Sequence, residues 1–231
     1  MLILIDDADL TKIEGFFAKY PYDGVTTNPT ILSKTGNPNP MDQLKKIRAI
    51  MPEGTDLHAQ VISTETDDMV REAEHMVEVL GKEHIYIKVP VTANGLKAIS
   101  ILSQKGINVT ATAIYGVMPA FMAAKAGAKF LAPYVNRLDV LGYDGVGIAI
   151  DIHTAVKAAG YEAEVLGASF KNSQQVLDMA KAGIGSVTIG SDALEKLAYN
   201  GIAEEAVKVF INDFEGCCGV VKGERKYGGK V

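Results

Sequence analysis

The stretch IYIKVPVTANGLKAISILSQKGINVTAT, residues 85–112, decides the fold of this chain. Its pattern predicts a buried strand over Ile85–Val89, an amphipathic helix near residues 94–105 and a second strand over Asn108–Thr112. A helix of this length between two buried strands makes a right-handed crossover, so the two strands lie parallel. The predicted building block is therefore a strand, a covering helix and a parallel strand.

The same alternation runs from one end of the chain to the other, without a Pro/Gly/Ser-rich linker. The predicted strands are Leu2–Asp6, Gly24–Thr27, Leu57–Ile62, Ile85–Val89, Asn108–Thr112, Lys129–Pro133, Glu164–Ala168 and Ser186–Ile189. Helices are predicted near residues 8–19, 41–50, 66–80, 94–105, 117–126, 145–159, 172–182 and 191–199, with a further amphipathic segment near 203–215. Lys-Ala-Gly at 125–127 and at 181–183 predicts helix ends closed by a left-handed glycine.

Eight such units favour an α/β fold, a (β/α)8 TIM barrel, as one domain over residues 1–231 with an additional C-terminal helix and tail. An open doubly wound sheet is the alternative, because periodicity alone does not establish that the sheet closes. No G-x-G-x-x-G follows the first strand, which argues against a dinucleotide-binding fold.

The composition narrows the functional classes. With 48% hydrophobic residues, 22% charged residues and a net charge of −5, the chain lacks the basic excess of a nucleic-acid-binding protein. Residues 1–5 have no basic lead and no apolar run is long enough for a bilayer, so we expect a cytoplasmic protein without a membrane partner. The adjacent Cys217 and Cys218 fit neither a disulfide framework nor a metal site.

Lys88 is the residue of greatest chemical interest, because it interrupts an otherwise apolar strand. Burial disfavours the charged ammonium and so lowers the pKa of a lysine, which leaves a nucleophilic amine near neutral pH. A Schiff-base lysine needs that state. The alternative is a lysine whose stem packs while its charged end reaches water.

Polar side chains gather at the predicted carboxyl ends of the strands, where barrels of this type carry their chemistry. Besides Lys88 they are Asp6, Thr26, Thr27, Asn28, Gln60, Thr110, Thr112, Tyr134, Asn136, Arg137, Ser169 and Lys171. Each has a local explanation of its own, such as capping or strand propensity. Converging at one mouth, however, they need a polar ligand or one another as hydrogen-bonding partners.

These parts assemble into a plausible reaction. Lys88 attacks a ketone and forms an iminium, Asp6 moves a proton at the neighbouring hydroxyl, and Tyr134 or Gln60 orients a water with Thr112 as its partner. Arg137, Ser169 and Lys171 form an anion clamp, which predicts a sugar phosphate as the ligand. No metal or cofactor is expected, because the four histidines share no metal-ligand spacing, and His58 is expected to pack or to hydrogen-bond locally.

The ordered segments around these residues resemble the transaldolase family. They are Asp6 after the first strand, VTTNP at 25–29, AQV at 59–61, IKVP at 87–90, APYVNR at 132–137 and ASFK at 168–171. The resemblance covers residues 2 to about 216. It implies a (β/α)8 barrel with Lys88 as the Schiff-base lysine and Asp6 as the acid-base carboxylate. It also implies Thr26, Asn28 and Thr112 around the dihydroxyacetone portion, and Arg137, Ser169 and Lys171 around the phosphate.

Two positions favour a subgroup of that family. Transaldolases usually have glutamate where Gln60 stands and phenylalanine where Tyr134 stands, whereas fructose-6-phosphate aldolases resemble this chain at both. The expected reaction is therefore reversible cleavage of fructose 6-phosphate into dihydroxyacetone and glyceraldehyde 3-phosphate. The chain departs from the family at Asp7, usually threonine, and at Gly190, commonly proline. Thr110 stands where many transaldolases have asparagine.

Several alternatives remain open from the sequence. One is a transaldolase that transfers the dihydroxyacetone unit to an acceptor, and another is a sulfonated ketose in place of the phosphate. A barrel that binds a sugar phosphate without turnover is a third. The resemblance also implies a homo-oligomer, a pentamer or a decamer, to which the last amphipathic helix contributes.

Overall fold

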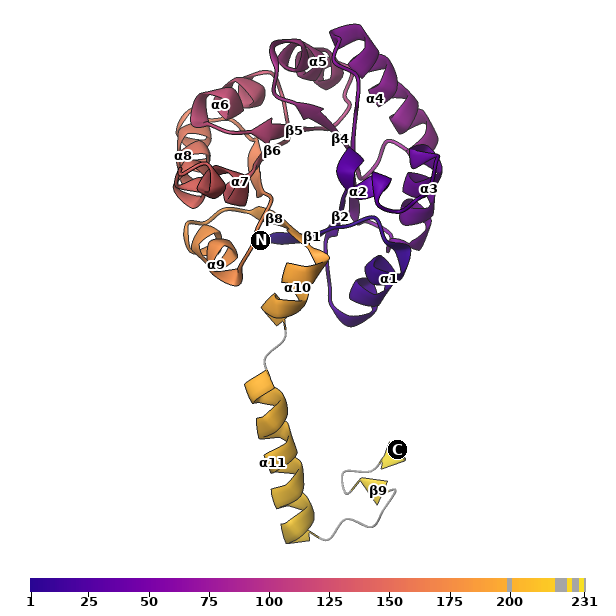
Figure 1. Ribbon diagram of the computed structural model, residues 1–231, viewed down its shortest axis with the longest axis vertical. Coiled ribbons are helices and arrows are strands. Elements are labelled where there is room, and N and C mark those ends of the chain that lie inside the picture. The colour runs from indigo at the N-terminus through magenta and orange to yellow at the C-terminus, as the bar shows by residue number, and fades with distance from the viewer. Residues whose placement is uncertain (199–200, 219–223, 226–228, 231) are drawn as a thin grey trace. The chain divides into compact units, whose positions relative to one another are not determined.

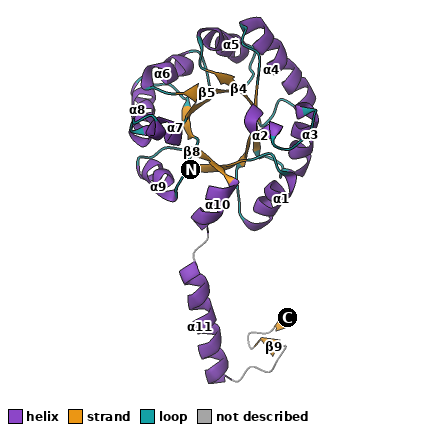
Figure 2. Ribbon diagram, viewed as in Figure 1, coloured by secondary structure: helices purple, strands orange, loops and turns teal. Residues whose placement is uncertain are grey.

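The computed structural model describes residues 1–198, 201–218, 224–225 and 229–230, which belong to two compact units, Met1–Leu194 and Glu195–Val231. In the first unit, eight strands close into a barrel in the order β1 to β8, and all eight neighbouring pairs are parallel. Helices surround the ring of strands (Figures 1 and 2). The predicted (β/α)8 barrel is confirmed, and the open sheet is excluded.

The strands are short and lie close to the predicted ranges. They are β1 (Leu2–Asp6), β2 (Gly24–Thr26), β3 (Asp56–Gln60), β4 (Ile85–Pro90), β5 (Val109–Ile114), β6 (Phe130–Pro133), β7 (Glu164–Gly167) and β8 (Ser186–Gly190). The surrounding helices are α1 (Leu10–Lys19), α2 (Pro29–Ser33), α3 (Pro40–Ile50), α4 (Thr66–Leu80), α5 (Ala93–Gln104), α6 (Val117–Lys125), α7 (Val135–Val140), α8 (Gly145–Ala158), α9 (Ser173–Lys181) and α10 (Ser191–Ala198).

Local sequence signals set many of the helix ends. The side chains of Asp9, Thr92 and Asp144 accept hydrogen bonds from the first turns of α1, α5 and α8, which stabilises helix starts. Gly127 and Gly183 follow α6 and α9 with φ of 100° and 79°, as the Lys-Ala-Gly repeats predict. Glycine is favoured there because other residues strain in the left-handed region.

Two short helices were not predicted, and both lie at the mouth of the barrel. Helix α2 begins at Pro29, directly after Asn28, whose side-chain oxygen accepts from Ile31 N at 2.9 Å. Helix α7 begins at Val135, directly after Tyr134. At five and six residues these helices are too short to show a 3.6-residue period. Arg137 therefore projects from a helix, not from the end of a strand.

Register defines the two faces of the barrel wall. Cα pairing places Asp6 beside Thr26, Gln60 beside Lys88, and Lys88 beside Thr110, so these side chains share one face. That face is the interior, because Thr26 on β2 contacts Thr188 on β8, a strand that is not its neighbour. Residues between them in sequence, such as Ile5 and Ile87, are fully buried on the outer face toward the helices.

The interior changes character from one end to the other. Leu4, Phe130 and Leu166 form a buried apolar cluster with Leu2 and Tyr86 packed against it. Hydroxyl, amide and charged groups follow toward the carboxyl ends of the strands. The apolar cluster therefore closes the barrel below the polar groups, so that a ligand has access only from the mouth.

In the second unit, α11 (Gly201–Cys218) precedes an antiparallel pair of two-residue strands, β9 (Glu224–Arg225) and β10 (Gly229–Lys230). The predicted C-terminal helix is confirmed. The side chains of Cys217 and Cys218 and most of the predicted tail lie outside the described residues. Within the described part of the chain, no helix is long and apolar enough to cross a membrane.

Candidate active site

Lys88 lies on the interior face of β4 with 5% of its surface exposed. Its Nζ donates a hydrogen bond of 2.8 Å to the backbone carbonyl of Thr27. Burial lowers the pKa of Lys88, and the negative charge of Asp6 opposes that shift. A neutral carbonyl oxygen is a weaker partner for an ammonium than a carboxylate, so this environment favours the neutral amine.

Asp6 ends β1 and lies across the interior from Lys88, toward the mouth. Its Oδ1 accepts a hydrogen bond of 2.6 Å from the Thr26 hydroxyl, which also lies 2.6 Å from the Thr188 hydroxyl. Burial raises the pKa of Asp6. The positive charge of Lys88 and the hydrogen bond from Thr26 both oppose this rise. Burial thus disfavours the charged form of each group, while the attraction between the two charges and the Thr26 hydrogen bond act in the opposite direction.

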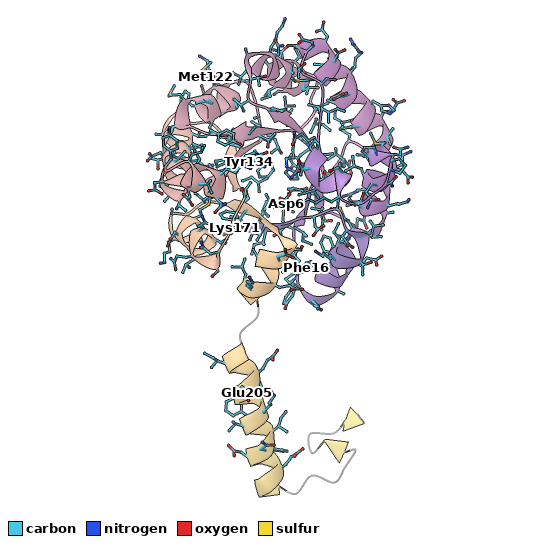
Figure 3. All side chains as sticks on the ribbon, in the orientation of Figure 1. Asp6, Phe16, Met122, Tyr134, Lys171 and Glu205 are labelled. Carbon is cyan, nitrogen blue, oxygen red and sulfur yellow. The ribbon has the colours of Figure 1, made fainter. Side chains whose placement is uncertain are left out.

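A second polar pair stands between β5 and β6. The hydroxyls of Thr112 and Tyr134 lie 3.0 Å apart, and either can donate. The Arg137 guanidinium covers the Tyr134 ring at 4.6 Å and donates to the Tyr115 hydroxyl at 3.2 Å. The rings of Tyr115 and Tyr134 meet edge to face. These contacts fix the Tyr134 phenol inside the ring of strands, where Figure 3 shows it together with Asp6.

Gln60 and Asn28 bring two amides to the same mouth. The Gln60 Cα pairs with that of Lys88, and the Gln60 Oε1 is buried without a hydrogen-bond partner among the described residues. Gln60 also borders a pocket of about 600 Å³ between the loops that follow β3 and β4. The oxygen of Asn28 caps α2, which leaves its NH₂ group as the available donor.

The predicted anion clamp lies where β6 and β7 end. Asn136 N donates to the Ser169 carbonyl at 2.9 Å, which holds the start of α7 against the end of β7. Ser169 has a φ of 63°, a left-handed backbone that is strained for serine. Arg137 and Lys171 are exposed, with Lys171 following Ser169 by two residues. Arg137 thus leaves helix α7 after β6, and Ser169 and Lys171 leave the loop after β7, at one side of the mouth.

Two other predicted site residues have their hydroxyls engaged by protein. The Thr27 hydroxyl donates to the His58 carbonyl at 3.1 Å, so that Thr27 offers Lys88 only its own backbone carbonyl. The Thr110 hydroxyl lies 2.8 Å from His58 Nδ1. His58 itself is fully buried, and the expectation that it packs is confirmed by its ring contacts with Tyr86 and Phe130, while its hydrogen-bond partner lies two strands away.

Sequence reasoning missed Thr188 and Tyr115. Strict alternation along β8 does place Thr188 on the interior face. Tyr115 directly follows β5, three residues after the inward-facing Thr112. Neither signal tells which partner the side chain reaches. Within the described residues, no cluster of three or more His, Cys, Asp or Glu side chains is placed to hold a metal ion.

Comparison with known proteins gives a consistent result. The family model described as "Transaldolase/Fructose-6-phosphate aldolase" matches residues 3–218. The chain is 39% identical over 215 residues to a "Probable transaldolase" of Geotalea daltonii, covering 93% of this chain and 98% of the relative. A "Probable transaldolase" of Hydrogenobaculum sp. is 37% identical, with 93% and 97% covered. A "Probable fructose-6-phosphate aldolase" of Streptococcus pneumoniae is 35% identical, with 93% and 96% covered.

Proposed function

Because this chain belongs to the transaldolase/fructose-6-phosphate aldolase family of enzymes, we propose that it is a Schiff-base aldolase acting on fructose 6-phosphate. The reaction is the reversible cleavage into dihydroxyacetone and glyceraldehyde 3-phosphate. The observation that carries this proposal is the buried Lys88 amine on the interior face of β4, with its pKa lowered by burial and the charge of Asp6 acting on it. A barrel that only binds sugars has no use for such an amine.

The proposed chemistry starts at the C2 carbonyl of the open-chain ketose. The Lys88 nitrogen adds to that carbon, and loss of water gives an iminium. Asp6 takes the proton from the C4 hydroxyl, the C3–C4 bond breaks, and its electron pair neutralises the iminium to an enamine while glyceraldehyde 3-phosphate leaves. Protonation at C3 restores the iminium, and water then releases dihydroxyacetone and the free amine.

The pair of hydroxyls at Thr112 and Tyr134 supports the protonation step. Their separation of 3.0 Å allows one to donate to the other while the second stays available to a water molecule. Gln60 faces the same interior, and its buried oxygen supplies an acceptor for that water. A water held in this way carries the proton to C3 of the enamine and later attacks the iminium carbon.

Arg137, Ser169 and Lys171 are the proposed phosphate ligands. A guanidinium offers a planar fork of donors to phosphate oxygens, and Lys171 adds a point charge. Thr26, Asn28 and Asn136 are proposed to meet the hydroxyls of the sugar. The proposed phosphate ligands follow β6 and β7, whereas Lys88 lies on β4, and we propose that the extended six-carbon chain crosses the mouth from one to the other.

Transaldolase activity is the second candidate, and the names of the two relatives from Geotalea daltonii and Hydrogenobaculum sp. favour it. A transaldolase keeps the enamine until an aldehyde acceptor arrives, which requires slow protonation at C3. Tyr134 and Gln60 instead favour protonation, and therefore release of free dihydroxyacetone. This contrast separates the two reactions experimentally.

The test combines covalent trapping with product analysis. Incubation with fructose 6-phosphate and borohydride should add a reduced three-carbon adduct to Lys88, detected by peptide mass spectrometry. Without an acceptor, the aldolase should release one dihydroxyacetone per glyceraldehyde 3-phosphate over many turnovers. Release of glyceraldehyde 3-phosphate that requires erythrose 4-phosphate, without free dihydroxyacetone because the three-carbon unit passes to that acceptor, would assign the transaldolase reaction instead.

Two lysine variants give a matched control for this test. Lys88→Met should lose the adduct and all cleavage, because the nucleophile is gone. Lys171→Met removes an amine at the same mouth and should keep the adduct with dihydroxyacetone, while raising the KM for the phosphorylated ketose. An adduct on any lysine other than Lys88, or none at all, would refute the mechanism.

A further inference from the structure

His58 is a buried titratable group that the proposed reaction does not use. It lies on β3 inside the barrel, with its ring stacked on Tyr86 at 4.7 Å and near Phe130 at 5.3 Å. Its Nδ1 lies 2.8 Å from the Thr110 hydroxyl. The Nε2 is buried and has no hydrogen-bond partner among the residues that the structure describes. Buried polar atoms are normally hydrogen-bonded, so a buried histidine with an unpaired ring nitrogen calls for an explanation.

The position of the His58–Thr110 pair suggests that reason. The pair joins β3 to β5 and so passes over β4, the strand that carries Lys88. A second interior pair, Thr26–Thr188, joins β2 to β8 and passes over β1, the strand that carries Asp6. Thr26 donates directly to Asp6. Each reactive group therefore has a polar pair from its two flanking strands, as expected where alternate strands share a layer.

The protonation state of His58 follows from its surroundings. Burial, together with the positive charge of Lys88, lowers the pKa of His58 well below its ordinary value, so the ring is neutral. One ring nitrogen then carries a hydrogen and the other a lone pair. A buried N–H without an acceptor costs more than an unpaired lone pair, so the hydrogen belongs on Nδ1, facing Thr110.

That tautomer determines what Thr110 can do. When Nδ1–H donates to the Thr110 oxygen, the hydroxyl hydrogen of Thr110 is free to point elsewhere. Thr110 and Lys88 are paired neighbours on β5 and β4, so the free hydrogen lies beside the amine that forms the Schiff base. A donor ketone joined to Lys88 brings its own hydroxyl groups to this place.

We propose that His58 is a positioning residue that sets the Thr110 hydroxyl as a hydrogen-bond donor to the donor ketone. The group recognised is the C1 hydroxyl of bound dihydroxyacetone, the hydroxyl on the carbon that does not form the new bond. Hydroxyacetone lacks this hydroxyl but still forms the enamine, so the preference for dihydroxyacetone over hydroxyacetone measures the contact. This inference rests on the proposed Schiff-base function.

Two amide variants of His58 form a matched pair for the test. His58→Asn keeps a donor where Nδ1 was, whereas His58→Gln moves it to the position of Nε2. The readout is the ratio of kcat/KM for dihydroxyacetone to that for hydroxyacetone, with glyceraldehyde 3-phosphate as the acceptor. His58→Gln and Thr110→Val should each lower this ratio about tenfold, the size of one hydrogen bond, and His58→Asn should stay within about threefold.

A stability control separates positioning from folding. Ser186→Ala removes another buried interior hydrogen bond, the 2.8 Å bond from Ser186 Oγ to the Val165 carbonyl, on strands away from β4. Ser186→Ala should lower Tm without changing the ratio of kcat/KM for dihydroxyacetone to that for hydroxyacetone. The double variant His58→Gln/Thr110→Val should lose no more of the preference for dihydroxyacetone than Thr110→Val alone, because His58 acts through Thr110.

The outcomes distinguish this inference from the proposed function. If the unaltered protein forms a borohydride adduct at Lys88 but His58→Gln keeps the ratio, His58 does not position Thr110. An equal fall of this ratio in His58→Asn and His58→Gln would contradict the assigned hydrogen bond from Nδ1 to Thr110. Absence of any adduct in the unaltered protein would overturn both the inference and the proposed function.

Discussion

At the scale of single residues, the site depends on two ionisable groups that burial drives in opposite directions. Burial lowers the pKa of Lys88 and raises that of Asp6, while the attraction between their charges works against both shifts. Because the proposed Schiff-base reaction needs the neutral amine, the balance between these effects should control how much of Lys88 can react at a given pH. The pH dependence of borohydride trapping at Lys88 should therefore measure the interaction between Lys88 and Asp6.

Asp6→Asn should shift the trapping reaction to lower pH. The negative charge of Asp6 raises the pKa of Lys88, so its removal lets that pKa fall further. The midpoint of the borohydride-trapping rate with dihydroxyacetone, which rises with pH as Lys88 loses its proton, should move toward acid. Cleavage of fructose 6-phosphate should fall about 100-fold or more, because the proposed proton acceptor is lost.

Asp7→Asn is the matched control for that experiment. It removes the neighbouring carboxylate, which pairs with Lys12 and whose charge acts on Asp6 but not directly on Lys88, and should move the midpoint of trapping much less than Asp6→Asn does. A midpoint that moves toward alkaline pH in Asp6→Asn would contradict the assigned interaction between Asp6 and Lys88.

The sequence revealed some of these residues better than others. Lys88 was conspicuous because an ammonium in an apolar strand is costly, and Asp6 because a carboxylate ended the first strand. The roles of His58, Thr188 and Tyr115 depend on contacts between strands that are not neighbours in the chain. Periodicity gives the face on which such a side chain lies, and the partner is set only when the barrel closes.

At the scale of elements, the long helices and all eight strands followed from hydrophobic periodicity, whereas α2 and α7 did not. Both short helices begin directly after a predicted site residue, Asn28 or Tyr134. The placement of Lys88 likewise depends on a close contact between elements. Gly95 in α5 packs against the backbone of Pro90, the last residue of β4, and a Cβ at Gly95 would lie 1.9 Å from the Pro90 carbonyl oxygen.

Gly95→Ala should therefore displace α5 from β4. We expect Tm to fall by about 5 °C or more and trapping at Lys88 to slow, because the strand that carries the amine has to move. Gly15→Ala in α1 is the control, since no atom lies within 4 Å of its added Cβ. There alanine should stabilise the helix by roughly 0.5–1 kcal/mol. Thermal unfolding of both variants, beside their trapping rates, tests this contrast.

At the scale of the whole molecule, closure of the sheet removes the open edges at which strands aggregate. Val207, Phe210 and Ile211 recur along α11 at helical spacing, and a single helix cannot bury its own apolar side chains. The expected homo-oligomer would supply a surface for them.

Phe210→Ser should weaken that assembly. Phe210 is exposed in the single chain, and if the expected assembly buries it, its loss should cost about 3 kcal/mol, which corresponds to a dissociation constant more than 100-fold higher. Sedimentation over a range of protein concentrations should then show smaller particles than for the unaltered chain. Asp213→Ser on the same helix controls for the substitution itself, and an unchanged mass for Phe210→Ser would remove α11 from the assembly interface.

The hydroxyl pair between Thr26 and Thr188 joins residues 162 positions apart and lies directly against Asp6. During synthesis, β4 and its lysine leave the ribosome well before β8 does. The Thr26 hydroxyl that donates to Asp6 gains its Thr188 partner only after the final strand has joined the first. A truncated product would thus carry the amine without its properly set acid, and catalysis would begin only once the barrel is complete.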